Sequence, residues 1–145
     1  SKESAKPMSA SPAFFRELEH TADLAIEVWG EDFASLLAHA AEAAFVLEGL
    51  PEAGNERVVH EVTVHAPDRE TLLVDWLNEL LFLSETLGEM YTGFTVRLAG
   101  DSALTATVEG HRGHPTKRRI KAATFYDLRV VCDEGRCVAR IVFDV

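Results

Sequence analysis

The strongest structural signal in the chain is the stretch TLLVDWLNELLFLSETL, which runs from residue 71 to residue 87. Its apolar side chains cover almost the whole circumference of the helix that their spacing predicts. The polar positions leave only a narrow stripe, made of Asp75, Asn78, Glu79 and Glu85. A helix with so little polar surface is mostly buried. At a rise of 1.5 Å per residue it spans about 25 Å, the width of a small domain, so we expect it to be the core helix.

Further elements are predicted on both sides of this helix, which begins after an expected N-cap at Asp68. A second helix is expected between an N-cap at Asp32 and a terminating glycine, Gly49. Strands are predicted at residues 14–18, 24–29, 57–66, 94–98, 104–108, 120–131 and 138–145. This order predicts an α+β fold, a two-layer sandwich in which two helices pack on one face of a mostly antiparallel sheet.

The length of 145 residues predicts one domain that buries about two-thirds of its unfolded surface. Residues 1–12 are rich in Ser, Ala, Lys and Pro and are expected to be a disordered leader, followed by a single domain at residues 13–145. No apolar run approaches the roughly 18 residues of a membrane helix. Residues 1–12 also lack the pattern of a signal peptide, so we expect a cytoplasmic protein.

The charge balance is acidic: 14 Lys and Arg residues stand against 24 Asp and Glu residues, a net charge of -10. This argues against nucleic-acid binding over the whole surface, because such binding depends on neutralising phosphates. It fits a protein that docks on a basic partner or holds divalent cations. One basic cluster, residues 117–121, can contact phosphate or an acidic partner, or can simply be a solvated loop.

Two short acidic stretches are candidates for a metal site. The turn at residues 19–23 displays His20 and Asp23, and the chain finishes on Asp144-Val145. The carboxylates of Asp23 and Asp144 and a terminal carboxylate on Val145 are hard oxygen ligands that suit Ca²⁺, Mg²⁺ or Mn²⁺. Our working hypothesis is that the two stretches meet and share a cation, in which case extending the chain past Val145 impairs function. The alternative is that Asp23 caps a turn and Asp144 is a solvated strand end.

The remaining histidines and the cysteines predict little chemistry. His60 and His65 are expected to face solvent on a strand. Cys132 and Cys137 can face each other across a hairpin, but we expect them to be reduced, as cytosolic thiols usually are. The sequence contains no Gly-rich phosphate loop, nucleophile elbow or recognisable Cys-His pair. An independent catalytic centre is therefore not predicted.

Four motifs, taken together, resemble those of the archease family over residues 14–145. They are HTAD at residues 20–23, LLVDWLNELL at 72–81, KAATFY at 121–126 and VFDV at 142–145. The second and fourth motifs are the specific ones. The third departs from the family pattern, which commonly reads Thr-Tyr-His where this chain has Thr124-Phe125-Tyr126.

The resemblance implies a non-catalytic accessory protein, an activator of the RtcB-type tRNA-splicing RNA ligase. Such proteins promote the metal- and GTP-dependent guanylylation of the ligase and its multiple turnover, and they meet RNA only indirectly. The resemblance places a divalent metal, calcium first with magnesium or manganese as alternatives, on Asp23, Asp144 and Val145. It also makes Lys121, and with it His20, a candidate contact to the ligase or its nucleotide.

Two other classes of function remain as alternatives. One is a general chaperone or modulator of RNA-modifying enzymes, which predicts exposed apolar surface and several partners. The other is a stand-alone metal-dependent hydrolase that uses Asp23 and Asp144. The hydrolase is disfavoured because the sequence shows no general base or nucleophile to accompany them.

Overall fold

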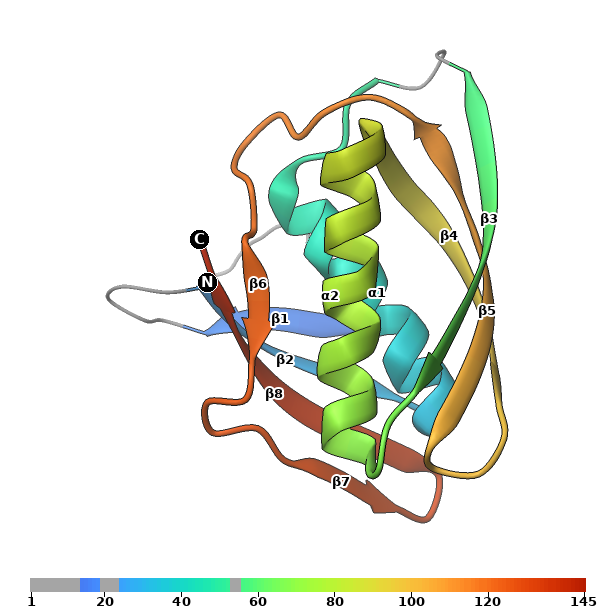
Figure 1. Cartoon of the computed structure of the whole chain (residues 1–145). Coiled ribbons are helices and arrows are strands. Elements are labelled where there is room, and N and C mark those ends of the chain that lie inside the picture. The colour runs from blue at the N-terminus through green and yellow to red at the C-terminus, as the bar shows by residue number, and fades with distance from the viewer. Residues whose placement is uncertain (1–13, 19–23, 53–55) are drawn as a thin grey trace.

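The computed structural model describes residues 14–18, 24–52 and 56–145 (Figure 1). The predicted leader at residues 1–12 and the predicted site residues His20 and Asp23 lie outside this part of the chain. The elements in chain order are β1 (Phe15–Leu18), β2 (Leu24–Gly30), α1 (Phe33–Glu48), β3 (Arg57–His65), α2 (Arg69–Leu87), β4 (Glu89–Leu98), β5 (Ala103–Arg112), β6 (Ala122–Thr124), β7 (Val130–Asp133) and β8 (Arg136–Asp144).

The strands form two antiparallel sheets. The first has the order β1-β2-β8-β6, with β7 also paired to β8, and the second has the order β3-β5-β4. Helix α1 packs on β2 of the first sheet and on β4 of the second, and α2 contacts β6, β4 and β3. Both helices thus lie between the sheets (Figure 1). The α+β class and the antiparallel pairing are confirmed, while the single sheet expected from the sequence is divided in two.

Local capping signals place both helices. The Asp32 carboxylate accepts a hydrogen bond from Ser35 N–H (2.8 Å), and the Asp68 carboxylate accepts one from Thr71 N–H (2.8 Å). These bonds lower the pKa of both carboxyl groups because they stabilise the charged form. Gly49 ends α1 at a φ of 92°, where a side chain would also collide with Thr116. The predicted helices and their N-caps are confirmed.

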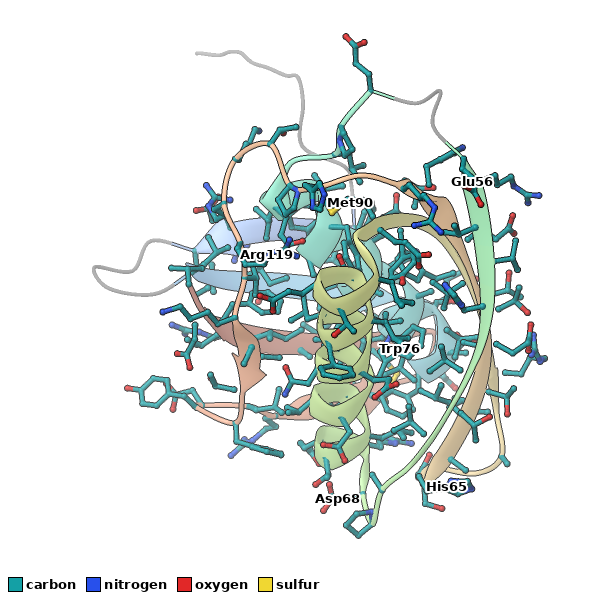
Figure 2. The ribbon with its side chains drawn as sticks, turned by 45° about the horizontal axis from the view of Figure 1, so that its top comes forward. Glu56, His65, Asp68, Trp76, Met90 and Arg119 are labelled. Atoms are coloured by element: carbon teal, nitrogen blue, oxygen red, sulfur yellow. A yellow bond between two sulfur atoms is a disulfide. The ribbon has the colours of Figure 1, made fainter. Side chains whose placement is uncertain are left out.

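Helix α2 is the core helix that its sequence predicts. Trp76 is fully buried and donates from its indole nitrogen to the carbonyl oxygen of Leu37 in α1 (2.8 Å; Figure 2). The other buried residues of the helix are Leu72, Leu73, Val74, Leu77, Leu80, Leu81 and Ser84. Two apolar residues of the helix are exposed, Phe82 at 63% and Leu87 at 40%. The outer stripe of the helix is therefore less polar than expected.

The strand predicted at residues 120–131 is wrong, because a turn divides it into β6 and β7. Leu128 N–H donates to the carbonyl oxygen of Phe125 (3.1 Å), and Asp127 adopts a left-handed φ of 53°. An aspartate tolerates this conformation better than most residues. Both resulting strands pair with β8, β6 along its end and β7 along its beginning.

The expectation of reduced cysteines is also wrong, because Cys132 and Cys137 form a disulfide. They are directly opposite each other in the β7–β8 hairpin, with their Cα atoms 4.0 Å apart. Among the described helices, none is both long enough and apolar enough to cross a membrane.

Candidate functional site

Two segments that carry sequence motifs, and the strand that follows a third motif, meet at one end of the first sheet. Leu24, which follows Asp23 in the sequence, pairs with Phe143, which precedes Asp144. On the other side of β8, Ala122 pairs with Asp144, and Lys121 N–H donates to the carbonyl oxygen of Asp144 (2.8 Å). The carboxyl end of the chain consequently lies beside β6 (Figure 1). The register brings Lys121, Asp144 and Val145 together, while the predicted meeting of Asp23 with Asp144 stays a prediction because Asp23 lies outside the described residues.

The alternation of the strands determines which residues face solvent at this end. Leu24, Phe143 and Ala123 are all buried and share the face that meets the helices. Because neighbouring residues of a strand point to opposite faces, Asp144 lies on the other face. Its side chain is exposed, as are Val145 and Lys121. Within the described residues no hydrogen bond or ion pair engages the Asp144 carboxylate.

The predicted metal site includes Asp23, which lies outside the described residues. In the part of the chain that the structure describes, no group of three His, Cys, Asp or Glu side chains is placed to hold a metal ion. The described donors at this end are the Asp144 carboxylate and the oxygens of Val145. Both are hard oxygen donors and fit the chemistry of Ca²⁺ or Mg²⁺, but a full ligand set needs further oxygens.

Asn78 holds β6 in place. Its side-chain amide donates to the carbonyl oxygen of Ala123 (3.2 Å), and its side-chain oxygen accepts from Ala123 N–H (2.7 Å). These bonds cover the edge of β6 that faces away from β8. The Asn of the LLVDWLNELL motif is thereby explained as the residue that fixes the strand following Lys121.

Glu48, at the end of α1, is a residue that the sequence reasoning missed. It is buried, and its carboxylate accepts a hydrogen bond from Ile120 N–H (2.8 Å), next to Lys121. The guanidinium of Arg119 lies 4.0 Å from the same oxygen, on the segment that leads into β6 (Figure 2). Burial raises the pKa of Glu48, although the Ile120 hydrogen bond and Arg119 oppose the shift. No sequence signal distinguishes Glu48 from an ordinary solvated glutamate at a helix end.

The basic cluster at residues 117–121 mostly serves the same helix end. Lys117 and Arg118 donate their N–H groups to the carbonyl oxygen of Glu48, and the Arg118 side chain donates to the carbonyl oxygen of Leu47. Cations near the last turn of a helix also interact favourably with its dipole. Lys121 differs in position, because its N–H bonds to the carbonyl oxygen of Asp144 and not to the end of α1. Of the basic cluster, Lys121 is therefore the residue that lies at the Asp144 end of the sheet.

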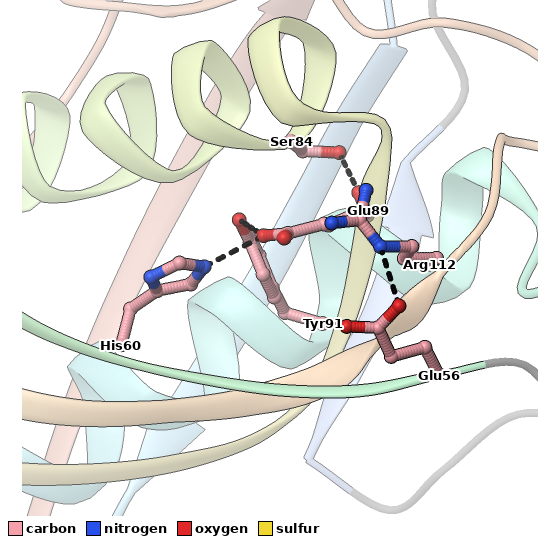
Figure 3. A network of polar contacts seen from close by, with 6 residues as sticks. All are labelled: Glu56, His60, Ser84, Glu89, Tyr91 and Arg112. Carbon is pink, nitrogen blue, oxygen red and sulfur yellow. Dashed lines mark hydrogen bonds and ion pairs between the residues drawn. The ribbon is translucent and has the colours of Figure 1, made fainter.

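A second polar network lies in the other sheet (Figure 3). The buried Glu89 carboxylate lies 2.7 Å from His60 Nε2 and accepts a hydrogen bond from the Tyr91 hydroxyl (2.7 Å). Ser84 donates to the main-chain oxygen of Glu89, and Arg112, opposite Glu89 on β5, pairs with Glu56 (3.1 Å). The prediction that His60 faces solvent is wrong. Burial and the Glu89 carboxylate raise the pKa of Tyr91, so the phenol stays neutral and the network links β3, β4 and α2.

The chain is similar to known proteins over most of its length. The model of the Archease protein family (MTH1598/TM1083) matches residues 15–145. Protein archease of Methanosarcina mazei is 32% identical over 139 residues, which cover 90% of this chain and 95% of that protein. Protein archease of Methanothermobacter thermautotrophicus is 31% identical, with 90% of this chain and 98% of that protein covered.

Two solved structures are similar in fold. The solution structure of protein 1598 of Methanobacterium thermoautotrophicum matches with a TM-score of 0.67 and 31% identity, covering 90% of this chain and 98% of that one. The crystal structure of an archease from Thermotoga maritima, described as a possible chaperone, matches with a TM-score of 0.64 and covers 97% of this chain and 100% of that one. At 24% identity, the second likeness supports the fold alone.

Proposed function

The chain belongs to the archease family, and on that premise we propose that it is a non-catalytic activator of an RtcB-type tRNA-splicing RNA ligase. In this proposal it acts in the cytoplasm and promotes the metal- and GTP-dependent guanylylation of the ligase. It thereby allows the ligase to turn over repeatedly. The working surface is the acidic end of the first sheet, around Lys121, Asp144 and Val145.

The observation that supports this proposal is that the KAATFY and VFDV motifs meet at one strand end, beside the strand that follows the HTAD motif in the sequence. Lys121 and Asp144 are separated widely in sequence, yet the Lys121 N–H bonds to the Asp144 carbonyl oxygen at 2.8 Å. Leu24, adjacent to Asp23 in the chain, is paired with Phe143 on the other side of β8. Asn78 and Glu48 hold β6 and the segment before it. A surface built from distant segments and held by buried polar groups is suited to a defined contact.

We propose that Asp23, Asp144 and Val145 hold a divalent cation, with calcium first and magnesium or manganese as alternatives. Such a cation supplies concentrated positive charge that can orient phosphate oxygens or carboxylates of a partner. Lys121 contributes a second, mobile positive charge that can contact a phosphate or a carboxylate of the ligase. His20 is proposed as a further contact to the ligase or its nucleotide.

The experiment is RNA-ligation turnover by an RtcB-type ligase at limiting enzyme, with and without this protein. Asp144→Asn and Lys121→Ala test the surface, and Asp133→Asn, which removes an exposed carboxylate from the β7–β8 turn, is the matched control. Stimulation by the native chain and by the control, with loss in the two site variants, supports the proposal. Absence of stimulation across GTP and metal conditions would overturn it.

A second candidate is a general chaperone or modulator of RNA-modifying enzymes. Large exposed apolar side chains favour it, in particular Phe82 (63%), Phe125 (56%) and Tyr126 (63%). A chaperone should suppress aggregation of several unrelated clients, whereas a ligase activator should not. A panel of aggregating client proteins therefore separates the two candidates.

A further inference from the structure

Strand β3 has one partnered and one unpartnered edge. It pairs with β5 alone, at the end of the second sheet. Just beyond the strand ends, Ala66 N–H donates to Ser102 O (2.9 Å) and Arg112 N–H donates to Glu56 O (2.9 Å). Hydrogen-bonded and non-bonded pairs alternate along an antiparallel ladder. Ala66 and Glu56 are both hydrogen-bonded to the segment of β5, so the even-numbered residues of β3 between them also bond to β5.

The odd-numbered residues therefore direct their N–H and C=O groups toward the free edge. They are Arg57, Val59, Glu61, Thr63 and His65. Within the described residues no main-chain or side-chain group bonds to these outward groups. A charged side chain on an edge strand, such as Glu61, discourages the addition of another strand. The Glu61 carboxylate, however, forms an ion pair with Arg97 on β4 (3.0 Å), across the outer face of the sheet. The edge itself is left open.

A groove of about 400 Å³ lies beside this open edge. It is lined by Thr63, Val64 and His65 of β3 and by Asp75, Asn78 and Glu79 of α2. His65 and the start of α2 at Asp68 lie at the same end of the molecule (Figure 2). The groove thus has a strand edge on one wall and a helix face on the other.

The helix wall of the groove is acidic. Asp75 and Glu79 are exposed, and among the described residues neither carboxylate has a hydrogen-bond or ion-pair partner. Residues four apart on a helix are about 6 Å apart along its axis. Side chains two apart on an extended strand project on the same side at about 6.6 Å. A strand added to β3 would therefore present two alternate side chains at the spacing of these two carboxylates.

We propose that the groove between β3 and α2 binds an extended basic segment of a partner protein by strand addition. The main chain of the segment bonds to the outward groups of Thr63 and His65, which supplies affinity irrespective of sequence. Two Lys or Arg side chains, two positions apart, pair with Asp75 and Glu79 and supply selectivity. The net charge of -10 favours the approach of such a segment. Lys121, Asp144 and Val145 do not line this groove, and the inference does not depend on the ligase proposal.

Selection from a random octapeptide display library on the purified chain tests the proposal. We expect enrichment of peptides with two basic residues at alternate positions. A synthetic peptide of the enriched sequence should slow amide exchange in β3 and should bind the Asp75→Asn/Glu79→Gln variant at least about tenfold more weakly, since both charge-assisted bonds are lost. The Asp133→Asn/Glu134→Gln variant, with the same loss of charge on the β7–β8 turn, is the matched control and should bind normally.

The Thr63→Pro variant tests the main-chain hydrogen bonds of the proposed complex. It removes an N–H that points to the free edge and leaves the bonds to β5 in place. Binding should fall while thermal unfolding stays cooperative; if this variant does not fold, the carboxylate variant alone decides the outcome. The proposal is overturned if no basic alternating peptides are enriched, or if their binding is unchanged by the loss of Asp75 and Glu79 charges.

Discussion

The two sheets each end in a strand beside α2, but the side chains of the helix make different contacts with the two strand edges. On the first sheet, Asn78 bonds to both main-chain groups of Ala123 in β6, and Glu70 accepts from Val130 N–H at the start of β7 (2.9 Å). On the second sheet, the outward groups of β3 meet no such side chain among the described residues. An open strand edge can pair with another chain. The side of α2 that faces β6 therefore stabilises the fold, whereas the side that faces β3 leaves a strand edge available for binding.

The largest loss of stability is expected when the hydrogen bonds between Asn78 and β6 are removed. Asn78→Ala leaves the N–H and C=O of Ala123, a residue only 4% exposed, without partners. Leaving two buried main-chain groups unsatisfied should lower the free energy of unfolding by about 3 kcal/mol. Urea unfolding measures this. Asp75→Ala, one turn away on the open side, is the control, and an equal loss in both variants would contradict the comparison.

A smaller effect is expected at β7. Glu70→Ala removes the acceptor for Val130 N–H, a single bond at a site that is nearly buried. The free energy of unfolding should fall by about 1.5 kcal/mol. Glu70→Gln keeps an oxygen acceptor and should restore most of the loss. If the glutamine variant is as unstable as the alanine variant, the edge contact is not the cause.

The segment leading into β6 should make the stability of the protein depend on pH, through Glu48. The folded state raises the pKa of Glu48 above its ordinary value of 4.5, so it binds this proton more tightly than the unfolded chain does. The resulting stabilisation is present in full below pH 4.5 and is lost as the pH rises through the folded-state pKa. Glu48→Gln removes this contribution and can still accept from Ile120 N–H.

We therefore expect the native chain to lose stability relative to Glu48→Gln as the pH rises from acid to neutral, and the loss to be limited because the Ile120 hydrogen bond and Arg119 both stabilise the charged carboxylate. Denaturation of both proteins across this pH range measures the difference. A constant difference between them would show that Glu48 does not titrate as its burial requires.

The sequence predicts the local parts of this structure well and the long-range parts poorly. Asp32, Asp68 and Gly49 act on residues within one turn, so their capping roles can be read from their neighbours. The pairing of Leu24 with Phe143 joins the two ends of the chain, and no local pattern indicates that it belongs to a different sheet from β3. The α+β class could therefore be predicted from the sequence, and the division into two sheets could not.

The same limit applies to the candidate site. Lys121 and Asp144 could be selected from motifs, and the structure places them side by side. Glu48 and Asn78, which hold the segment around Lys121, act through burial and main-chain contacts that a sequence does not display. His60 was expected to face solvent although it shares the strand face of Val58, Val62 and Val64, because the sequence does not display its buried acidic partner Glu89 on another strand.

The smallest effect is expected at Phe82, on the outer stripe of α2 that also carries Asp75 and Glu79. Phe82 is 63% exposed, whereas its neighbour Leu81 is 4% exposed and belongs to the core. Phe82→Ser should change the free energy of unfolding by less than about 0.5 kcal/mol, as is usual for exposed positions. Leu81→Ala should cost about 3 kcal/mol because it leaves a cavity. Urea unfolding of the two variants measures both values. A large loss at Phe82 would mean that the outer stripe of α2 is covered in the folded protein, so that this side of the helix is not open.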